Sequence, residues 1–244
     1  YIMDIMNFDS DGDVNTQPVH HWLLPNSIRC VICGPSGCGK TNLMMNLIMR
    51  NGYLNYDKLI LYSKSLQQPK YKLLHQWGSE LNKAAEREVI SLYSAEPTSI
   101  EDLNPNKRTI LIFDDVMLEK QTPIEQYFSQ GRHSGADCFY LCQSYFRIPK
   151  QCIRDNANII ILFNQDVKNL RAIHDTFVSG DMDFAEFRKF FSECMTACKH
   201  AFAVIDLTRE ANNGKYRSQF DKCYIPQQCT MMYDSAQCCT IDTR

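Results

Sequence analysis

The chain has 244 residues, with 26 Lys and Arg against 28 Asp and Glu, and a formal net charge of −2. This length suits one full α/β core with appendages, and the small net charge excludes a global basic field, so any DNA contact has to come from a local basic patch. Since no run of about 18 apolar residues occurs, we expect no membrane-spanning helix and favour a soluble, intracellular protein.

From residue 28 onward, short apolar runs alternate with amphipathic stretches, which is typical of an α/β fold with a largely parallel sheet. The expected strands cover residues 28–33, 57–62, 88–93, 109–113, 137–142, 158–163 and 200–206. The expected helices cover 40–51, 70–83, 121–130, 166–177 and 183–197, with a short one near 149–155, and "KYRSQF" at 215–220 is expected to close a hairpin with 200–206. We therefore expect an N-terminal arm over 1–24, a main domain over 25–222 and a Cys-rich tail over 223–244.

The segment "VICGPSGCGKTN" carries the strongest motif. It satisfies G-x-x-x-x-G-K-[ST] and lies between an apolar strand and a helix, the context of a phosphate-binding loop. Glycines allow the backbone N–H groups to curl around phosphate oxygens, and the positive end of the following helix adds to the field. The predicted nucleotide-binding residues are Gly34, Pro35, Ser36, Gly37, Cys38, Gly39, Lys40, Thr41 and Asn42. Lys40 is expected to reach the β and γ phosphates of ATP, and Thr41 to ligate Mg²⁺.

A second motif, "TILIFDDV", places Asp114 at the end of an apolar strand, where a carboxylate can hold the Mg²⁺ shell through water. Asp115 follows in the position where many ATP hydrolases keep an acid that polarises the attacking water; its alternative role is a helix N-cap or turn residue. GTPases are disfavoured because the chain has neither N-K-x-D nor a glycine at the D-x-x-G spacing after Asp114. Small-molecule kinases are also disfavoured, because they usually carry a basic lid and no such segment is inserted before residue 130. The two motifs together predict a Mg²⁺-dependent ATPase.

Gln143 directly follows the apolar run at 137–142. If that run is a strand, Gln143 lies at its carboxyl end, where open α/β sheets place their ligand chemistry. An amide can donate to a γ-phosphate oxygen and accept from the attacking water, so Gln143 is a candidate sensor of hydrolysis. A structural glutamine that caps the strand is the alternative.

Five segments resemble a known family when read in order: "GPSGCGKT", "LIFDDV", "GRHSG", "YLCQSYFRIPK" and "IRDNANIIILF". They are similar to the FtsK–HerA superfamily, and most similar to the DNA-packaging ATPases of poxviruses and related large or virophage-like double-stranded DNA viruses and Polinton-type elements. The resemblance covers roughly residues 28 to 206. It implies a P-loop NTPase of the additional-strand (RecA/FtsK-like) type, whose sensor strand lies between the phosphate-loop strand and the Walker B strand.

The resemblance also implies roles for single residues. The loop from Gly34 to Thr41 corresponds to Walker A, Asp114 and Asp115 to the Walker B pair, and Gln143 to the sensor. Arg132 precedes the sensor strand, where the superfamily carries a basic residue suggested to reach the neighbouring subunit's nucleotide. Arg154 is the second candidate for that role, and the alternative for Arg132 is a solvated charge at a helix end.

The function implied by the resemblance is a homo-oligomeric ring, a pentamer or hexamer, that hydrolyses MgATP at subunit interfaces and drives double-stranded DNA into a preformed capsid. Capsid or packaging-vertex proteins are the further expected partners, and the host-cell cytoplasm or nucleus at the viral assembly site, or the virion, is the expected location. A plasmid or cellular DNA translocase and a non-translocating, ATP-switched assembly protein remain as alternatives.

Basic residues with interleaved aromatics follow the sensor strand. They are Arg147, Lys150, Arg154, Lys168 and Arg171, with Tyr145 and Phe146 among them. In a ring such residues can line a channel and contact DNA phosphates. Contacts between subunits and a solvated face are equally good interpretations.

Twelve cysteines are present, and several lie in apolar runs, where a thiol behaves as a small core residue. This favours free thiols in a reducing compartment. Cys30 and Cys33 have redox-motif spacing, but their place in the strand "IRCVICG" favours a structural role. Zinc is disfavoured because the candidate ligands lack paired-ligand spacing. Those candidates are Cys194, Cys198 and His200, and in the tail Cys223, Cys229, Cys238 and Cys239.

Overall fold

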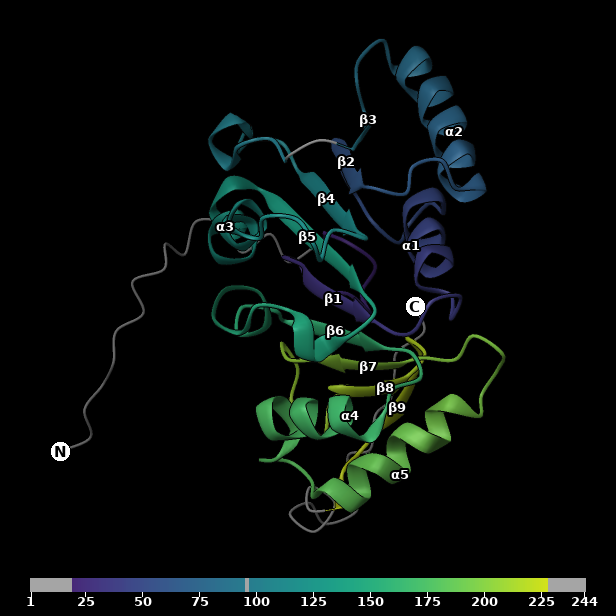
Figure 1. Cartoon of the computed structure of the whole chain (residues 1–244), viewed down its shortest axis with the longest axis vertical. Coiled ribbons are helices and arrows are strands. Elements are labelled where there is room, and N and C mark those ends of the chain that lie inside the picture. The colour runs from purple at the N-terminus through teal and green to yellow at the C-terminus, as the bar shows by residue number, and fades with distance from the viewer. Residues whose placement is uncertain (1–18, 95–96, 228–244) are drawn as a thin grey trace, which may run out of the picture.

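A nine-stranded sheet forms the centre of the protein (Figure 1). The structure is a computed structural model that describes residues 19–94 and 97–227. The strands are β1 (Arg29–Cys33), β2 (Lys58–Ser63), β3 (Ile90–Tyr93), β4 (Thr109–Asp114), β5 (Ala136–Cys142), β6 (Ile159–Leu162), β7 (Ala203–Asp206), β8 (Tyr216–Ser218) and β9 (Lys222–Tyr224), in the spatial order β3-β2-β4-β5-β1-β6-β7-β8-β9. The pairs from β3 to β6 are parallel, and those from β6 to β9 are antiparallel. The expected fold class, a mainly parallel sheet flanked by helices with a C-terminal hairpin, is confirmed.

Helices cover both faces of this sheet (Figure 1). On one face, α1 (Lys40–Met49) and α2 (Pro69–Ala85) bury Met44, Leu47 and Leu74. On the other face, α3 (Thr122–Gln130), α4 (Val167–Ile173) and α5 (Phe184–Met195) bury Phe128 and Phe190. Shorter turns connect them: the 3₁₀ turns η2 (Ile100–Asp102), η3 (Gly131–Ser134) and η4 (Tyr145–Arg147), and the π-helical turns η5 (Lys150–Arg154) and η6 (His174–Val178).

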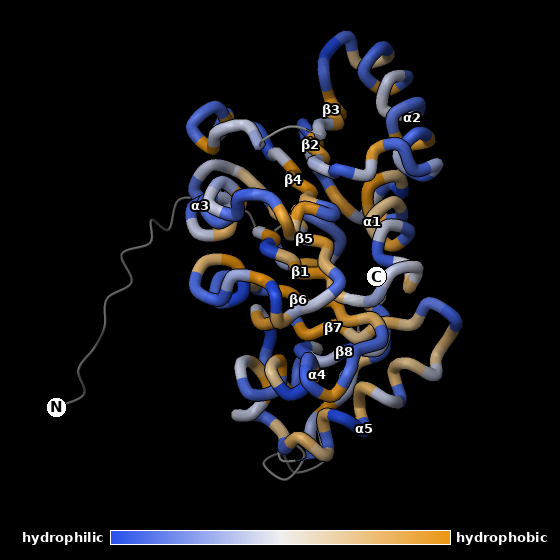
Figure 2. Tube along the Cα trace, in the orientation of Figure 1, coloured by the Kyte–Doolittle hydropathy of each residue, from blue (hydrophilic) through white to orange (hydrophobic). Residues whose placement is uncertain are grey.

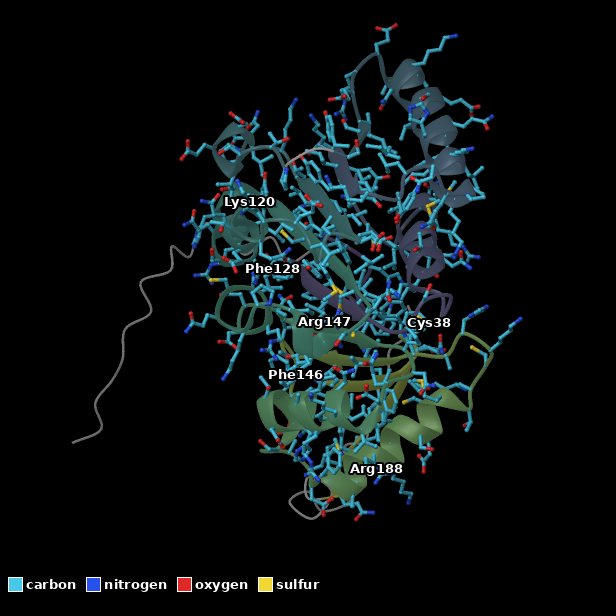
Figure 3. All side chains as sticks on the ribbon, in the orientation of Figure 1. Cys38, Lys120, Phe128, Phe146, Arg147 and Arg188 are labelled. Carbon is cyan, nitrogen blue, oxygen red and sulfur yellow. The ribbon has the colours of Figure 1, made fainter. Side chains whose placement is uncertain are left out.

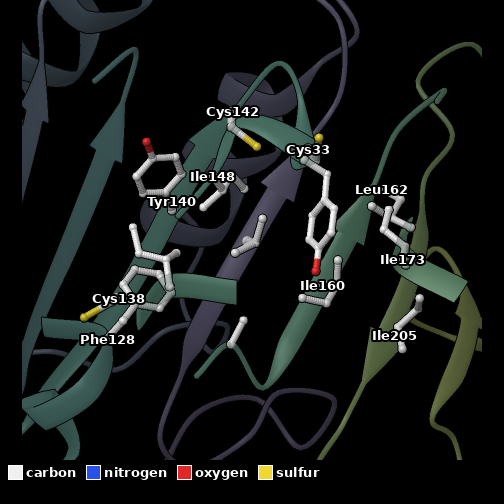
Figure 4. Close-up of a cluster of buried hydrophobic side chains, with 14 of the residues drawn as sticks. Cys33, Phe128, Cys138, Tyr140, Cys142, Ile148, Ile160, Leu162, Ile173 and Ile205 are labelled. Carbon is white, nitrogen blue, oxygen red and sulfur yellow. The ribbon is translucent and has the colours of Figure 1, made fainter. Parts of the chain in front are cut away.

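The apolar runs of the sequence become the central strands, whose hydrophobic residues are orange in Figure 2. At most one residue in each of β1, β2, β4, β5 and β6 is not buried. Alternate residues of β1 face opposite sides: Val31 and Cys33 join one core cluster, and Cys30 and Ile32 join the other. Part of the first cluster is drawn in Figure 4. Because Cys30 and Cys33 lie on opposite faces, they are packing residues and not a redox pair, and the described cysteines are free thiols.

Seven expected strands correspond to β1 through β7, and the expected terminal hairpin is the antiparallel pair β7–β8, with Ile205 opposite Tyr216. Two expected helices are present but are partly or wholly π-helical. The helix expected over 166–177 consists of α4 followed directly by the π-helical turn η6, and the short helix expected near 149–155 is the π-helical turn η5. The strand β9 was not predicted, because its sequence has no apolar alternation. It extends the sheet to Tyr224, across the expected domain boundary at residue 222.

The chain just before β1 is fixed by a buried carboxylate at the amino end of β5. Asp137, 2 % exposed, accepts a hydrogen bond from the Ile28 N–H (2.7 Å). Its other oxygen lies 3.0 Å from both His20 Nε2 and Arg108 Nη1. His20 itself is buried. The last residues of the expected N-terminal arm therefore pack on the main domain, whereas residues 1–18 lie outside the described residues.

A second buried ion pair joins the terminal hairpin. Arg217 Nη2 lies 3.1 Å from Asp206 Oδ2, and both side chains are fully buried. Burial lowers the pKa of the Arg217 guanidinium, and the charge of Asp206 opposes that shift. Arg209 Nε also lies 3.2 Å from Asp206 Oδ2, so this buried carboxylate joins the hairpin to the segment that follows β7.

Candidate functional site

The loop between β1 and α1 has the backbone that a phosphate cradle requires. Gly37 and Gly39 adopt positive φ angles of 75° and 119°, which side chains with a Cβ rarely tolerate. At Gly34 a Cβ atom would come within 2.6 Å of Phe163 Cβ and 2.7 Å of Cys38 Sγ. The glycines of the motif are therefore required by backbone conformation and by packing.

Lys40 begins α1 and folds back over this loop. Its Nζ donates hydrogen bonds to the carbonyl oxygens of Gly34 (2.6 Å) and Pro35 (3.0 Å). Pro35, Ser36 and Gly37 are exposed, so the loop is open to solvent. The ammonium group is thus already at the loop, where it can exchange carbonyl oxygens for phosphate oxygens.

The two predicted Mg²⁺ residues meet at the start of α1. Thr41 Oγ1 lies 3.4 Å from Asp114 Oδ2 and donates to it. Burial raises the pKa of the Asp114 carboxyl, while a hydrogen bond from Tyr71 and the charge of Lys40 oppose that shift. A hydroxyl and a carboxylate beside a phosphate loop are the oxygen donors that Mg²⁺ prefers, so these residues fit the ion.

Asp115 follows β4 in an unusual backbone conformation. Its φ of 59° is uncommon for a residue other than glycine and is found at strained functional positions. The side chain is exposed, and its Oδ2 accepts a hydrogen bond of 2.5 Å from Ser65 Oγ. The N-cap of the next α-helix is Gln121, so Asp115 does not serve as that cap.

Gln143 follows β5, which pairs with β1 on one side and with β4 on the other. The registers place Cys142 beside Cys33 and Leu141 beside Asp114, so the amide lies between the phosphate loop and the Walker B acids. The Gly34 N–H also donates to the Cys142 carbonyl oxygen (3.1 Å). The Gln143 side chain is exposed and makes no hydrogen bond to any described residue, so its amide is available to a ligand.

We expect Gln143→Ala to slow ATP hydrolysis by roughly 10²-fold, the effect of removing one positioned hydrogen-bond donor. ATP affinity should stay nearly unchanged because the loop and Lys40 remain. Steady-state turnover and titration with a fluorescent ATP analogue measure the two quantities. Gln126→Ala, which removes an exposed glutamine on α3, is the control, and full turnover by a folded Gln143→Ala protein would remove Gln143 from the site.

The two candidate arginines lie apart from this site. Arg132 precedes β5, whose 7 residues separate it from Gln143 by about 20 Å at a strand rise of about 3.3 Å per residue. It is exposed, and its Nε donates to His133 Nε2 (3.0 Å). The pKa of the nearby Arg29 guanidinium is lowered by burial and, to a smaller extent, by the charge of Arg132. No acidic side chain among the described residues forms an ion pair with Arg132. Arg132 therefore offers an uncompensated positive charge near the amino end of β5, whereas Gln143 follows the carboxyl end of that strand.

Arg154 packs against the buried Tyr145. Its guanidinium carbon lies 5.2 Å from the centre of the Tyr145 ring, and its Nε is buried without a hydrogen-bond partner among the described residues. The side chain is half-buried. It therefore presents less of its charge to a neighbour than Arg132 does.

The other candidate DNA-contacting residues divide into two groups. Arg147 and Lys150 are exposed after β5, and Lys168 Nζ lies over the exposed Phe146 ring at 4.6 Å from its centre. Figure 3 labels Phe146 and Arg147 beside each other on this surface. Arg171 instead stacks on Phe184, with 3.5 Å between guanidinium carbon and ring centre. The residues Phe146, Arg147, Lys150 and Lys168 form what we call the post-sensor surface.

Three residues contact the nucleotide site although the sequence did not predict this position for them. Tyr71 on α2 donates a hydrogen bond to Asp114, and Ser65 on the β2–α2 connection donates to Asp115. His200 Nδ1 lies 3.0 Å from the carbonyl oxygen of Cys38 in the phosphate loop. None belongs to a motif, and each reaches the site only through packing of segments distant in sequence.

Within residues 19–94 and 97–227, His, Cys, Asp and Glu side chains form no group of three that could hold a metal ion. Cys194 is buried and Cys198 exposed, while Cys229, Cys238 and Cys239 lie outside the described residues. In the described part of the chain, no helix has the length and apolar character needed to cross a membrane.

Solved structures of viral packaging NTPases have the same fold. The packaging NTPase B204 of Sulfolobus turreted icosahedral virus 2 matches in complex with AMPPCP (TM-score 0.53, 14 % identity, 76 % of this chain and 95 % of that one) and with sulfate (TM-score 0.54, 16 % identity, 75 % and 93 %). B204 of Sulfolobus turreted icosahedral virus, described as a DNA-packaging ATPase, matches with TM-score 0.50 and 17 % identity over 73 % of this chain and 92 % of that one.

At these identities the structural matches show a shared fold. No curated protein sequence matches the chain. The model of a protein family, described as poxvirus A32 protein, matches residues 18–207 and so covers most of the chain. The resemblance inferred from the motifs is thereby confirmed, and the chain belongs to the poxvirus A32 protein family.

Proposed function

We propose that this protein is a genome-packaging ATPase that hydrolyses MgATP and moves double-stranded DNA into a preformed capsid. One observation carries the proposal: β5 lies between the strands that bear the phosphate loop and the Walker B acids, and it brings Gln143 to both. This arrangement adds a sensor to a site that already holds Lys40, Thr41 and Asp114. The family match and the packaging NTPases of the same fold support the proposal.

The position of Arg132 supports a ring with nucleotide at subunit interfaces. The arginine lies at the sheet edge opposite Gln143, so it is too far from the phosphate loop of its own chain to act there. In a head-to-tail ring of five or six subunits, two different surfaces meet at each interface, so the amino end of β5 in one subunit could face the nucleotide site of the next. Arg132 of one subunit would then stabilise charge on the ATP of the next, and hydrolysis would depend on assembly.

The post-sensor surface is the favoured DNA contact. It presents Lys168 over the exposed Phe146 ring and has the exposed Arg147 and Lys150 close by in sequence, although the whole chain carries a net charge of −2. A local basic surface of this kind can contact DNA phosphates without a basic protein. Since it begins three residues after Gln143, DNA bound there would lie next to the sensor. Such a motor would act at the viral assembly site in the host cell.

Double-stranded DNA should stimulate ATP hydrolysis, and turnover per subunit should rise steeply with protein concentration because complete sites form only at interfaces. Turnover measured across a dilution series, with and without linear duplex DNA, tests both expectations, and electron micrographs with a non-hydrolysable ATP analogue test for a ring. Constant turnover per subunit and indifference to DNA would instead favour an ATP-switched assembly protein.

A further inference from the structure

The strongest feature without an assigned role is the tyrosine that reaches the Walker B carboxylate from α2. Tyr71 is 1 % exposed, and its hydroxyl donates to Asp114 Oδ2. A phenylalanine would fill the same space, so the hydroxyl serves something besides packing.

The hydrogen bonds to Asp114 are directed at one of its two oxygens. Thr41 and Tyr71 both donate to Oδ2, whereas Oδ1 receives no hydrogen bond from the described residues. Two donors on one oxygen restrict rotation of the carboxylate and keep the other oxygen available. Residues that orient a metal-binding carboxylate in this way typically change metal affinity by about 10–100-fold when removed.

The first turn of α2 is held in place by the same contacts. Tyr71, Leu74 and Gly78 are the buried residues of α2, and the remaining residues of the helix are exposed or half-buried. Ser63, at the end of β2, lies beside Asp114 in the sheet register and hydrogen-bonds the Ser65 N–H (3.1 Å). The Tyr71 hydroxyl thus connects a lightly packed helix directly to the residues that fit Mg²⁺.

We propose that Tyr71 is a positioning residue for magnesium: it orients Asp114 so that Oδ1 faces the ion's hydration shell, and it fastens the first turn of α2 to the metal site. The inference rests on the proposed MgATP hydrolysis. It assigns to α2 a role that no motif indicates, and it implies that Mg²⁺ binding should stabilise the first turn of the helix through Asp114 and Tyr71.

Tyr71→Phe tests the positioning role. Binding of a fluorescent ADP analogue is titrated at increasing Mg²⁺ and again in EDTA. We expect the Mg²⁺ concentration for half-maximal enhancement to rise by about tenfold, with affinity in EDTA unchanged. Tyr56→Phe is the matched control, because its half-buried phenol donates to the Ile48 carbonyl oxygen (3.3 Å) away from the site. A purely structural role for Tyr71 predicts a loss of stability with unchanged Mg²⁺ dependence, and that result would overturn the inference.

Hydrogen exchange of the unmodified protein tests the same proposal without a variant. Adding Mg²⁺ to the ADP-bound protein should increase protection of residues 69–74, and unchanged protection would overturn the fastening of α2. The proposed function fails separately: if the unmodified protein binds nucleotide without any response to Mg²⁺, the ATPase assignment is wrong whatever Tyr71 does. If it responds to Mg²⁺ and Tyr71→Phe responds equally, only the inference about Tyr71 fails.

Discussion

Lys40→Ala should abolish ATP hydrolysis, with a loss of roughly 10²–10³-fold or more, since it removes a positive charge aimed at the transferred phosphoryl group. The Nζ atom already lies at the loop, 2.6 Å from the Gly34 carbonyl oxygen. Removing it leaves the loop backbone and Thr41 in place. Turnover is measured by phosphate release, and the fold by circular dichroism.

Lys72→Ala is the matched control for this prediction. Lys72 is an exposed lysine on α2, so its removal changes net charge by the same amount without touching the loop. We expect its turnover to equal that of the unmodified protein. Normal turnover by a folded Lys40→Ala protein would show that the phosphate loop has been assigned wrongly.

Arg132→Ala should lower turnover by about 10³-fold or more while leaving ATP affinity of the subunit intact, because an arginine acting in trans stabilises the transition state and not the bound ground state. Lys107→Ala is the control: Lys107 is another exposed cation before a parallel strand at the same sheet edge. Equal losses in both variants would point to a general effect of charge at this edge.

Mixing experiments separate action in trans from a local role. A subunit with Arg132→Ala keeps its phosphate loop, and one with Lys40→Ala keeps its arginine, so some interfaces of a mixed ring are complete. Activity should therefore reappear on mixing two inactive proteins and be greatest near equal amounts. No recovery at any ratio would contradict the role in trans. Recovery with Arg154→Ala in place of Arg132→Ala would move the role to Arg154.

Much of the site could be predicted because its parts are local in sequence. The phosphate loop lies between Cys33 and Thr41, and its glycines need only a strand before them and a helix after them. Asp114 and Gln143 were predicted by the same reasoning, since each directly follows an apolar run that becomes a buried strand. Apolar residues that alternate between two covered faces determine the strands, whatever their neighbours are.

The place of β5 between β1 and β4 was expected from the family resemblance, whereas the register of the strands comes only from the tertiary structure. The registers place Cys142 beside Cys33 and Leu141 beside Asp114, and so bring Gln143 to the phosphate loop and the Walker B acids. Arg132 lies before the amino end of the same strand, although the two residues are only 11 positions apart. Tyr71 and Ser65 belong to no motif. They reach the Walker B acids because β2 pairs with β4 and α2 packs beside α1.

The sequence by itself determined the chemistry of this protein: the loop that fits phosphate, the acids that fit Mg²⁺, and the strands that carry them. The tertiary structure decided which of these groups meet and which face a neighbour. The physical reason is how far apart in sequence the residues lie that set each property. Turn conformation and burial are set by a few adjacent residues, whereas strand pairing and the packing of α2 depend on side chains from the whole chain, and a single sequence does not state their register.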